Sequence, residues 1–157
     1  MKHVIAVLLI GITVTALLTA CGDVGSPATH YTAYRLTCCA QGDIERTWQP
    51  GTAVDLHWIP STTEVTAVNP SHRVTITATL SGPYADVLTL KQGKTAAREV
   101  PGSTVTYDDR VAPAAGTVMT FLLPADLPPG LYNLETNWDF GAGDSASAGS
   151  VVQVGPG

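Results

Sequence analysis

Two stretches of the chain alternate apolar and polar side chains. In residues 53–59 (AVDLHWI), which include Trp58, and in residues 72–80 (HRVTITATL), every second side chain is apolar and most of the others are polar. A period of two is typical of an antiparallel strand with one buried face. Residues 117–123 (TVMTFLL) are almost continuously apolar, which predicts a strand in the middle of a sheet. The other candidate strands are residues 34–39, 84–90, 103–107, 131–138 and 150–154.

Prolines and glycines separate these candidate strands at steps of about ten residues. Short strands with turn residues at that spacing predict an all-β fold, and we expect a single antiparallel sandwich of about seven to nine strands. The composition agrees, because the 21 threonines equal all Asp, Glu, Lys and Arg together and β-branched residues favour strands. Residues 141–149 (GAGDSASAG) are predicted to form a hairpin loop between the last two strands.

The N-terminus has a basic start, then about fifteen apolar residues, then small residues before Cys21. This order is typical of a secretory signal peptide. Residues 18–21 (LTAC) resemble the lipobox of bacterial lipoproteins, and the richness in Ala, Thr, Val and Gly looks actinobacterial. The resemblance implies that residues 1–20 are a cleaved signal helix and that Cys21 carries the lipid, including palmitate. The alternative is an uncleaved anchor, because the uncharged run from 4 to 22 nearly reaches the roughly 20 residues that span a bilayer.

Residues 21–30 (CGDVGSPATH) are small and rich in turn formers, which predicts a flexible tether. The folded domain is then expected over residues 31–157, a length that suits one hydrophobic core. Both interpretations of the leader place this domain at the cell membrane, on its extracytoplasmic face. The acyl chains on Cys21 would be the membrane contact.

Residues 126–138 (DLPPGLYNLETNW) resemble the approach to the penultimate strand in immunoglobulin-like and fibronectin III-like sandwiches. The resemblance implies that Tyr132 forms a tyrosine corner, in which its hydroxyl donates to main chain just upstream. Residues 48–58 (WQPGTAVDLHW) are similar to the start of many bacterial immunoglobulin-like domains, where a Pro-Gly turn precedes a strand with a core aromatic residue. Trp58, Tyr132 and Trp138 are therefore expected in the core.

Cys38 and Cys39 are adjacent, and both remain if Cys21 is lipidated. Three interpretations stay open: one packs in a strand core while the other faces out, the two form a vicinal disulfide, or they serve redox or metal chemistry helped by His30 or Met119. Neighbouring Cα atoms lie about 3.8 Å apart across a trans peptide, closer than in most disulfides. A bridge therefore requires a distorted or cis peptide.

Charge and motifs exclude several functional classes. The formal net charge of -5 and the lack of a basic run argue against nucleic acid binding. No nucleotide-binding, metalloprotease or hydrolase motif occurs in the sequence. Asp108 and Asp109 are interpreted as a solvated turn, and His57 and His72 as incidental residues on a threonine-rich face.

The expected function is therefore physical rather than catalytic. We expect no catalytic residue, no cofactor and no metal. The protein is predicted to be a membrane-anchored binding or structural module at the cell envelope, with an unidentified envelope protein or glycan as partner. The alternative is a redox or metal-handling lipoprotein that uses Cys38 and Cys39.

Overall fold

The computed structural model describes residues 26–68, 70–92, 95–114 and 116–156. Within these ranges the protein is an all-β, sandwich-like fold with ten strands and two short helices, α1 (Gln41–Glu45) and α2 (Val87–Lys91). The predicted signal helix, Cys21 and the first half of the predicted tether lie outside the described residues. No helix among the described residues is long and apolar enough to cross a membrane.

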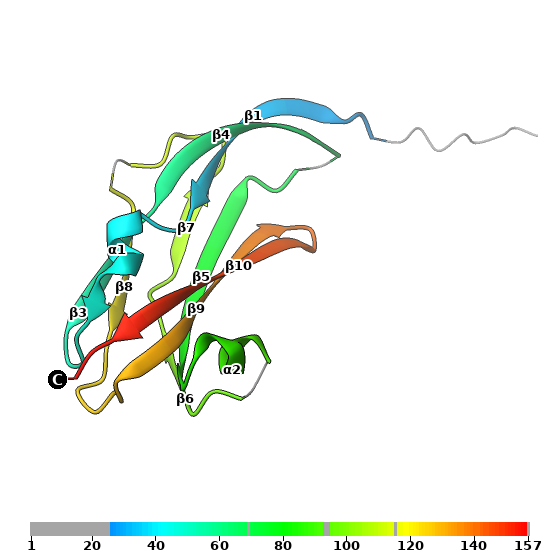
Figure 1. Cartoon of the computed structure of the whole chain (residues 1–157). Helices are drawn as coiled ribbons and strands as arrows, with labels where there is room; N and C mark the ends of the chain where they lie inside the picture. Colours follow the sequence, from blue (N-terminus) through cyan, green and yellow to red (C-terminus); the bar gives the residue numbers. More distant parts are fainter. Residues whose placement is uncertain (1–25, 69, 93–94, 115, 157) are drawn as a thin grey trace, which may run out of the picture.

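The larger sheet has six strands (Figure 1). Its order is β2–β10–β9–β5–β6. β7 pairs with the same edge of β5 as β6 does, but with the first residues of that strand. The strands are antiparallel except for the short parallel pair β2–β10. Their bounds are β2 Thr47–Trp48, β5 Arg73–Tyr84, β6 Arg98–Pro101, β7 Val105–Asp108, β9 Gly130–Gly141 and β10 Asp144–Val154.

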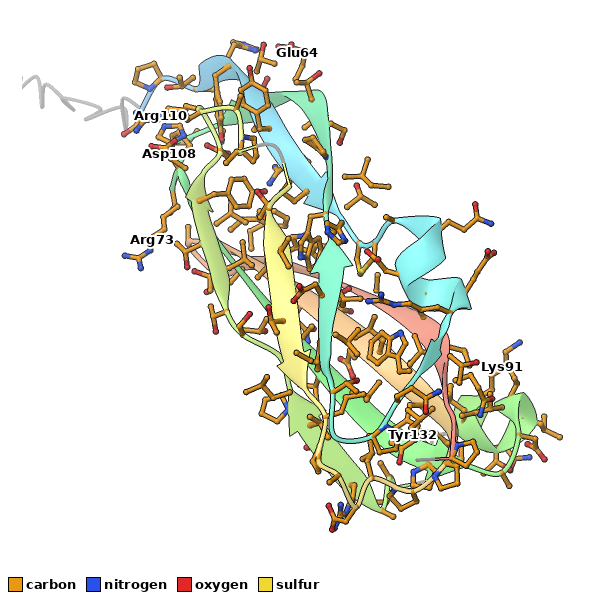
Figure 2. The ribbon with its side chains drawn as sticks, turned by 90° about the vertical axis from the view of Figure 1, so that its left-hand side faces the viewer. Glu64, Arg73, Lys91, Asp108, Arg110 and Tyr132 are labelled. Carbon is orange, nitrogen blue, oxygen red and sulfur yellow. A yellow bond between two sulfur atoms is a disulfide. The ribbon has the colours of Figure 1, made fainter. Side chains whose placement is uncertain are left out.

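Two antiparallel pairs form the second layer. One is a ribbon of β1 (Thr29–Thr37) and β4 (Ile59–Ala67), and the other joins β3 (Ala53–His57) to β8 (Val118–Leu122). Figure 2 shows β3 and β8 in front of the larger sheet, with side chains between the layers. Because only Trp58 separates β3 from β4, the chain passes directly from one pair to the other.

The core lies between the two layers and follows from the alternation in the sequence. Along β5, buried aliphatic residues alternate with more exposed threonines, and β9 shows the same alternation over its first half. The smaller layer contributes its own buried side chains from β3 and β8. Full burial of one such side chain stabilises the fold by about 1.5–3 kcal/mol. The predicted all-β sandwich is thus confirmed, with a core that includes Leu56, Val74, Ile76, Leu80, Met119, Phe121 and Leu134.

The three aromatic residues expected in the core lie at the junction of the layers. Trp58 and Tyr132 are buried, whereas Trp138 is partly buried and packs against the core. The Trp58 and Trp138 rings meet edge to face, with centroids 5.8 Å apart. The Tyr132 hydroxyl donates to the Pro128 carbonyl at 2.8 Å, the contact that a tyrosine corner requires. The Trp138 indole donates to the Leu36 carbonyl at 2.9 Å and ties β9 to β1.

Residues 84–90 do not form the predicted strand. Most of the segment folds into α2, because Asp86 caps the helix by accepting from the Thr89 main-chain nitrogen at 2.6 Å. Conversely, β4 has no counterpart among the predicted strands. Its side chains are exposed on both faces, so the segment lacks the alternation that identifies a half-buried strand.

Three further predictions need correction. β8 is not central in a sheet: it forms a strand ladder with β3 alone, and Leu122 is 74% exposed. The loop predicted at residues 141–149 is a two-residue turn at Ala142 and Gly143, both with positive φ, and the remainder belongs to long hairpin strands. β1 begins at Thr29, so it includes the last two residues of the segment predicted to be a flexible tether.

Candidate functional site

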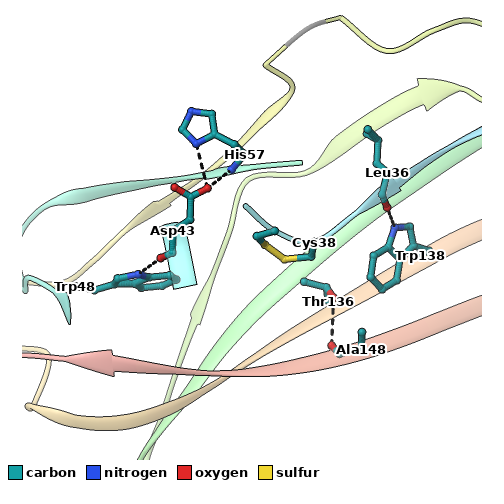
Figure 3. Close-up of a disulfide and its surroundings, with 9 residues drawn as sticks. Leu36, Cys38, Asp43, Trp48, His57, Thr136, Trp138 and Ala148 are labelled. Carbon is teal, nitrogen blue, oxygen red and sulfur yellow. Dashed lines mark hydrogen bonds and ion pairs between the residues drawn. A yellow bond between two sulfur atoms is a disulfide. The ribbon is translucent and has the colours of Figure 1, made fainter. Parts of the chain in front are cut away.

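Cys38 and Cys39 are joined by a disulfide in the connection between β1 and α1 (Figure 3). The peptide bond between them is cis. β1 ends at Thr37, so the pair lies outside the strand, and the interpretation in which one cysteine packs in a strand core while the other faces out does not apply. Cys39 is buried in the core, whereas Cys38 is partly buried and packs against it.

The residues considered as metal or redox helpers have other roles. His30 shares a hydrogen bond with the Thr66 hydroxyl at 2.8 Å, on the exposed ribbon of β1 and β4. Met119 is fully buried in the hydrophobic core. Within the described ranges, no three or more His, Cys, Asp or Glu side chains are grouped so as to hold a metal ion.

A carboxylate organises the turn that follows the disulfide. Asp43 on α1 accepts from the main-chain nitrogen of His57 at 2.7 Å, and the same carboxylate oxygen lies 3.1 Å from the His57 Nδ1 (Figure 3). The Asp43 carbonyl accepts from the Trp48 indole at 2.8 Å. The Ala40 main-chain nitrogen also donates a hydrogen bond to the His57 carbonyl. These contacts fasten the disulfide segment and α1 to the end of β3.

A second carboxylate, Asp109, follows β7 and is buried, with only 2% of its surface exposed. One of its oxygens accepts from the Tyr31 hydroxyl at 3.0 Å, and the other lies 3.0 Å from the His72 Nδ1. The interpretation of Asp109 as part of a solvated turn is therefore wrong. Asp108 fits it better, since it is more exposed and pairs with Arg110 on the surface.

Asp109 also holds the chain through its main chain. Its nitrogen donates to the His72 carbonyl at 2.8 Å, and its carbonyl accepts from the Tyr34 nitrogen at 2.6 Å. The Tyr31 and His72 rings meet edge to face at 4.8 Å. Burial, and next the hydrogen bond to Asp109, raise the pKa of Tyr31 above its ordinary value. Asp109 thus joins β1 to the segments that flank β5 and β7.

Next to this cluster lies a cleft of about 160 Å³ between the ribbon and the turn of the β9–β10 hairpin. Arg35 and Tyr31 line it from β1, Asp109 from the chain after β7, and Phe140 and Asp144 from the hairpin. The Arg35 guanidinium lies over the Phe140 ring, 4.2 Å from its centroid. The cleft is therefore a concave site that combines apolar walls with charged groups from separate segments.

The sequence did not single out Arg35 or Phe140, because 105 positions separate them and neither belongs to a motif. One signal was available: Arg35 is a charged residue within a predicted strand beside a cysteine pair.

The structure adds a second hollow, on the outer face of the larger sheet, lined by hydroxyl, amide and carboxylate side chains. Its lining includes Thr75, Thr77, Asn137, Asp139, Ser145 and Ser147.

The polar side chains of that outer face stand in register. Thr75, Asp139 and Ser145 occupy paired positions on β5, β9 and β10, and Thr77, Asn137 and Ser147 form the next such row. The threonine-rich strand noted in the sequence thus forms part of a wider polar surface.

This chain matches none of the known protein-family models and none of the curated protein sequences.

Proposed function

We propose that this protein is a membrane-anchored lipoprotein that acts as a binding module on the extracytoplasmic side of the cell envelope. The observation that carries the proposal is the leader, which ends in LTAC at residues 18–21, followed by a short tether and a β-sandwich. Acyl chains on Cys21 would hold the domain at the membrane, since each buried methylene contributes about 0.8 kcal/mol. The domain itself would supply the contact with a protein or glycan.

Two surfaces support a binding role. The two rows of hydroxyl, amide and carboxylate groups on the outer face of the larger sheet offer donors and acceptors to a polar partner such as a glycan. The cleft beside Asp109 offers a smaller, partly apolar site. We propose binding, and no reaction, at either surface.

The intact mass of the full chain, expressed in a bacterial host and extracted from membranes, tests the anchor. We expect the mass of residues 21–157 plus lipid, and an unlipidated precursor from the Cys21→Ser variant. The double variant Cys38→Ser/Cys39→Ser is the matched control and should still be lipidated. An unmodified full-length chain in the membrane fraction would instead establish an uncleaved anchor.

A second candidate function rests on the disulfide between Cys38 and Cys39. In this alternative, an envelope dithiol protein reduces the bond: its two thiols become a disulfide, and Cys38 and Cys39 each end as a thiol. Cys38 is the accessible partner, because Cys39 is buried. Trapping of thiols in living cells tests this exchange. If thiol labels on Cys38 and Cys39 appear only after a chemical reductant is added, the disulfide is not reduced in the cell. That result would reject the redox function and leave the binding module as the proposed function.

A further inference from the structure

The cleft beside Asp109 is formed by segments that are distant in sequence. The ribbon of β1 and β4 and the β9–β10 hairpin reach toward the same side of the molecule (Figure 1). Gly141 at the hairpin turn approaches Ser71 so closely that an added Cβ would lie 2.6 Å from the serine side chain. The hairpin turn therefore lies directly against the segment that leads into β5, beside the cleft.

Arg35 carries a charge that has no ion-pair partner among the described residues. Its guanidinium lies over the Phe140 ring, its Nη1 atom is shielded from water, and that atom has no hydrogen-bond partner among the described residues. No described carboxylate forms an ion pair with it. A buried donor without an acceptor is unfavourable, and the cost is larger for a charged group. The rest of the Arg35 side chain is only partly buried, so the charge of the guanidinium can still be balanced by an anion in the cleft.

Asp144 lines the same cleft with the opposite charge. It forms no ion pair or side-chain hydrogen bond with a described residue, and it does not pair with Arg35. The other carboxylate of the cleft, Asp109, is already engaged with Tyr31 and His72. Two unpaired opposite charges in one cleft match a ligand that carries both charges itself.

The size and walls of the cleft limit the ligand further. A volume of about 160 Å³ is close to the roughly 150 Å³ of a cavity that holds benzene, so the cleft suits a group of that size. Val65, Ala67, Val68 and Pro70 provide an apolar wall. Arginine binds carboxylates through two parallel hydrogen bonds, which a carboxylate over the exposed part of the guanidinium would satisfy.

We propose that this cleft binds a free α-amino acid with a small aliphatic side chain. Its carboxylate pairs with Arg35, its ammonium group with Asp144, and its side chain contacts the wall that contains Val65. This inference deepens the binding role proposed above and rests on it, but it does not depend on lipidation of Cys21. The intact-mass experiment tests the anchor, and a separate binding experiment tests the ligand.

Titration calorimetry on the membrane-extracted protein in detergent tests the ligand chemistry with four probes. L-valine carries both charges, valinamide lacks the carboxylate, 3-methylbutanoate lacks the ammonium group, and N-acetylvaline mimics the end of a peptide. We expect saturable binding of L-valine and at least a tenfold weaker affinity for each of the other three. Equal binding of N-acetylvaline, or no binding of any aliphatic amino acid up to about 10 mM, would overturn the proposal.

Variants locate the site. Arg35→Met keeps a side chain that can lie over Phe140 but removes the charge, and Asp144→Asn removes the opposite charge. Each should weaken L-valine binding at least tenfold, whereas the surface controls Arg73→Met and Asp126→Asn should not change it. Arg35→Lys, which keeps the charge, serves if Arg35→Met does not fold as judged by circular dichroism, and it should also weaken binding. Unchanged affinity in Arg35→Met would place any amino acid elsewhere and reject this site.

Discussion

The protein contains two aspartate–histidine pairs of nearly the same local geometry and different surroundings. The His72 Nδ1 lies 3.0 Å from Asp109, and the His57 Nδ1 lies 3.1 Å from Asp43. The side chains of the first pair are 23% and 2% exposed, whereas those of the second are 54% and 11% exposed. The distance between the two groups therefore does not distinguish the pairs, and burial does.

The two pairs also differ in what they connect. Asp109 accepts from Tyr31 on β1 and lies beside His72 just before β5, so it joins segments from both layers. Asp43 accepts from the main chain of His57, 14 positions away, and shapes the turn after the disulfide. Both aspartates are buried, Asp43 at 8% and Asp109 at 2% exposed. The one whose partners come from separate segments should matter for the whole fold, and the one that holds a nearby main-chain nitrogen should matter for a local turn.

The largest expected effect in this comparison is that of Asp109→Ala. The substitution leaves the Tyr31 hydroxyl and the His72 imidazole without their acceptor, and we expect a loss of about 3 kcal/mol in the free energy of unfolding. Urea denaturation followed by tryptophan fluorescence measures it. Asp108→Ala is the matched control, because the neighbouring carboxylate pairs with Arg110 at the surface, and its loss should be much smaller. Equal losses would mean that burial does not separate the two carboxylates.

A smaller effect is expected from Asp43→Ala. The main-chain nitrogen of His57 loses its acceptor, which should cost about 1–2 kcal/mol in the same denaturation experiment. Asp43→Asn retains an acceptor oxygen and should cost less. Glu45→Ala, on the same helix and exposed, is the control. If Asp43→Ala destabilises the protein more than Asp109→Ala, the contrast drawn between the two pairs is wrong.

Tyr31→Phe isolates one arm of the buried pair. Loss of the hydroxyl that donates to Asp109 should cost about 1 kcal/mol. In a protein that already carries Asp109→Ala, the same change should cost almost nothing, because its partner is absent. Tyr34→Phe is the control, since the Tyr34 hydroxyl forms no hydrogen bond with the described residues. Additive losses in the double variant would show that Tyr31 and Asp109 act independently.

The features that the sequence predicted well are those with a local signal. Alternation over residues 72–80 identified the central strand β5, and the resemblance of residues 126–138 to immunoglobulin-like sandwiches implied the hydrogen bond that the Tyr132 hydroxyl makes four residues upstream. Both depend on neighbours within a few positions. β4 was missed because its stability comes from pairing with β1, some thirty residues away, and not from a pattern of its own.

The candidate site could not be predicted because its parts meet only in the folded chain. Tyr31 and Asp109 are 78 positions apart, and the burial of Asp109 depends on β1 crossing the chain after β7. Arg35 and Phe140 likewise meet through the position of the hairpin against the ribbon. The state of the cysteine pair depends on whether the strand ends before Cys38 or includes both cysteines. Local residues do not fix that boundary.

The smallest expected effect is a fall in the free energy of unfolding at alkaline pH. It compares Tyr31 with two tyrosines that form no hydrogen bond to the Asp109 carboxylate. Burial is the main cause that raises the pKa values of Tyr31, Tyr107 and Tyr132, and only Tyr31 has an added hydrogen bond to Asp109. A raised tyrosine pKa means that the folded state favours the neutral phenol. The contribution of these tyrosines to the free energy of unfolding is therefore fully present below about pH 10, the ordinary tyrosine pKa. It is lost as pH rises through their pKa values in the folded state.

Nuclear magnetic resonance of the tyrosine rings can follow each of these ionisations separately. We expect all three to titrate above pH 10, and the free energy of unfolding to fall in the same range. In the Asp109→Asn variant the pKa of Tyr31 should decrease, because the carboxylate charge is gone, but it should stay raised by burial. The pKa of Tyr132 should not change. A decrease of equal size at Tyr132 would show that the substitution loosens the whole fold, and that Asp109 has no specific action on Tyr31.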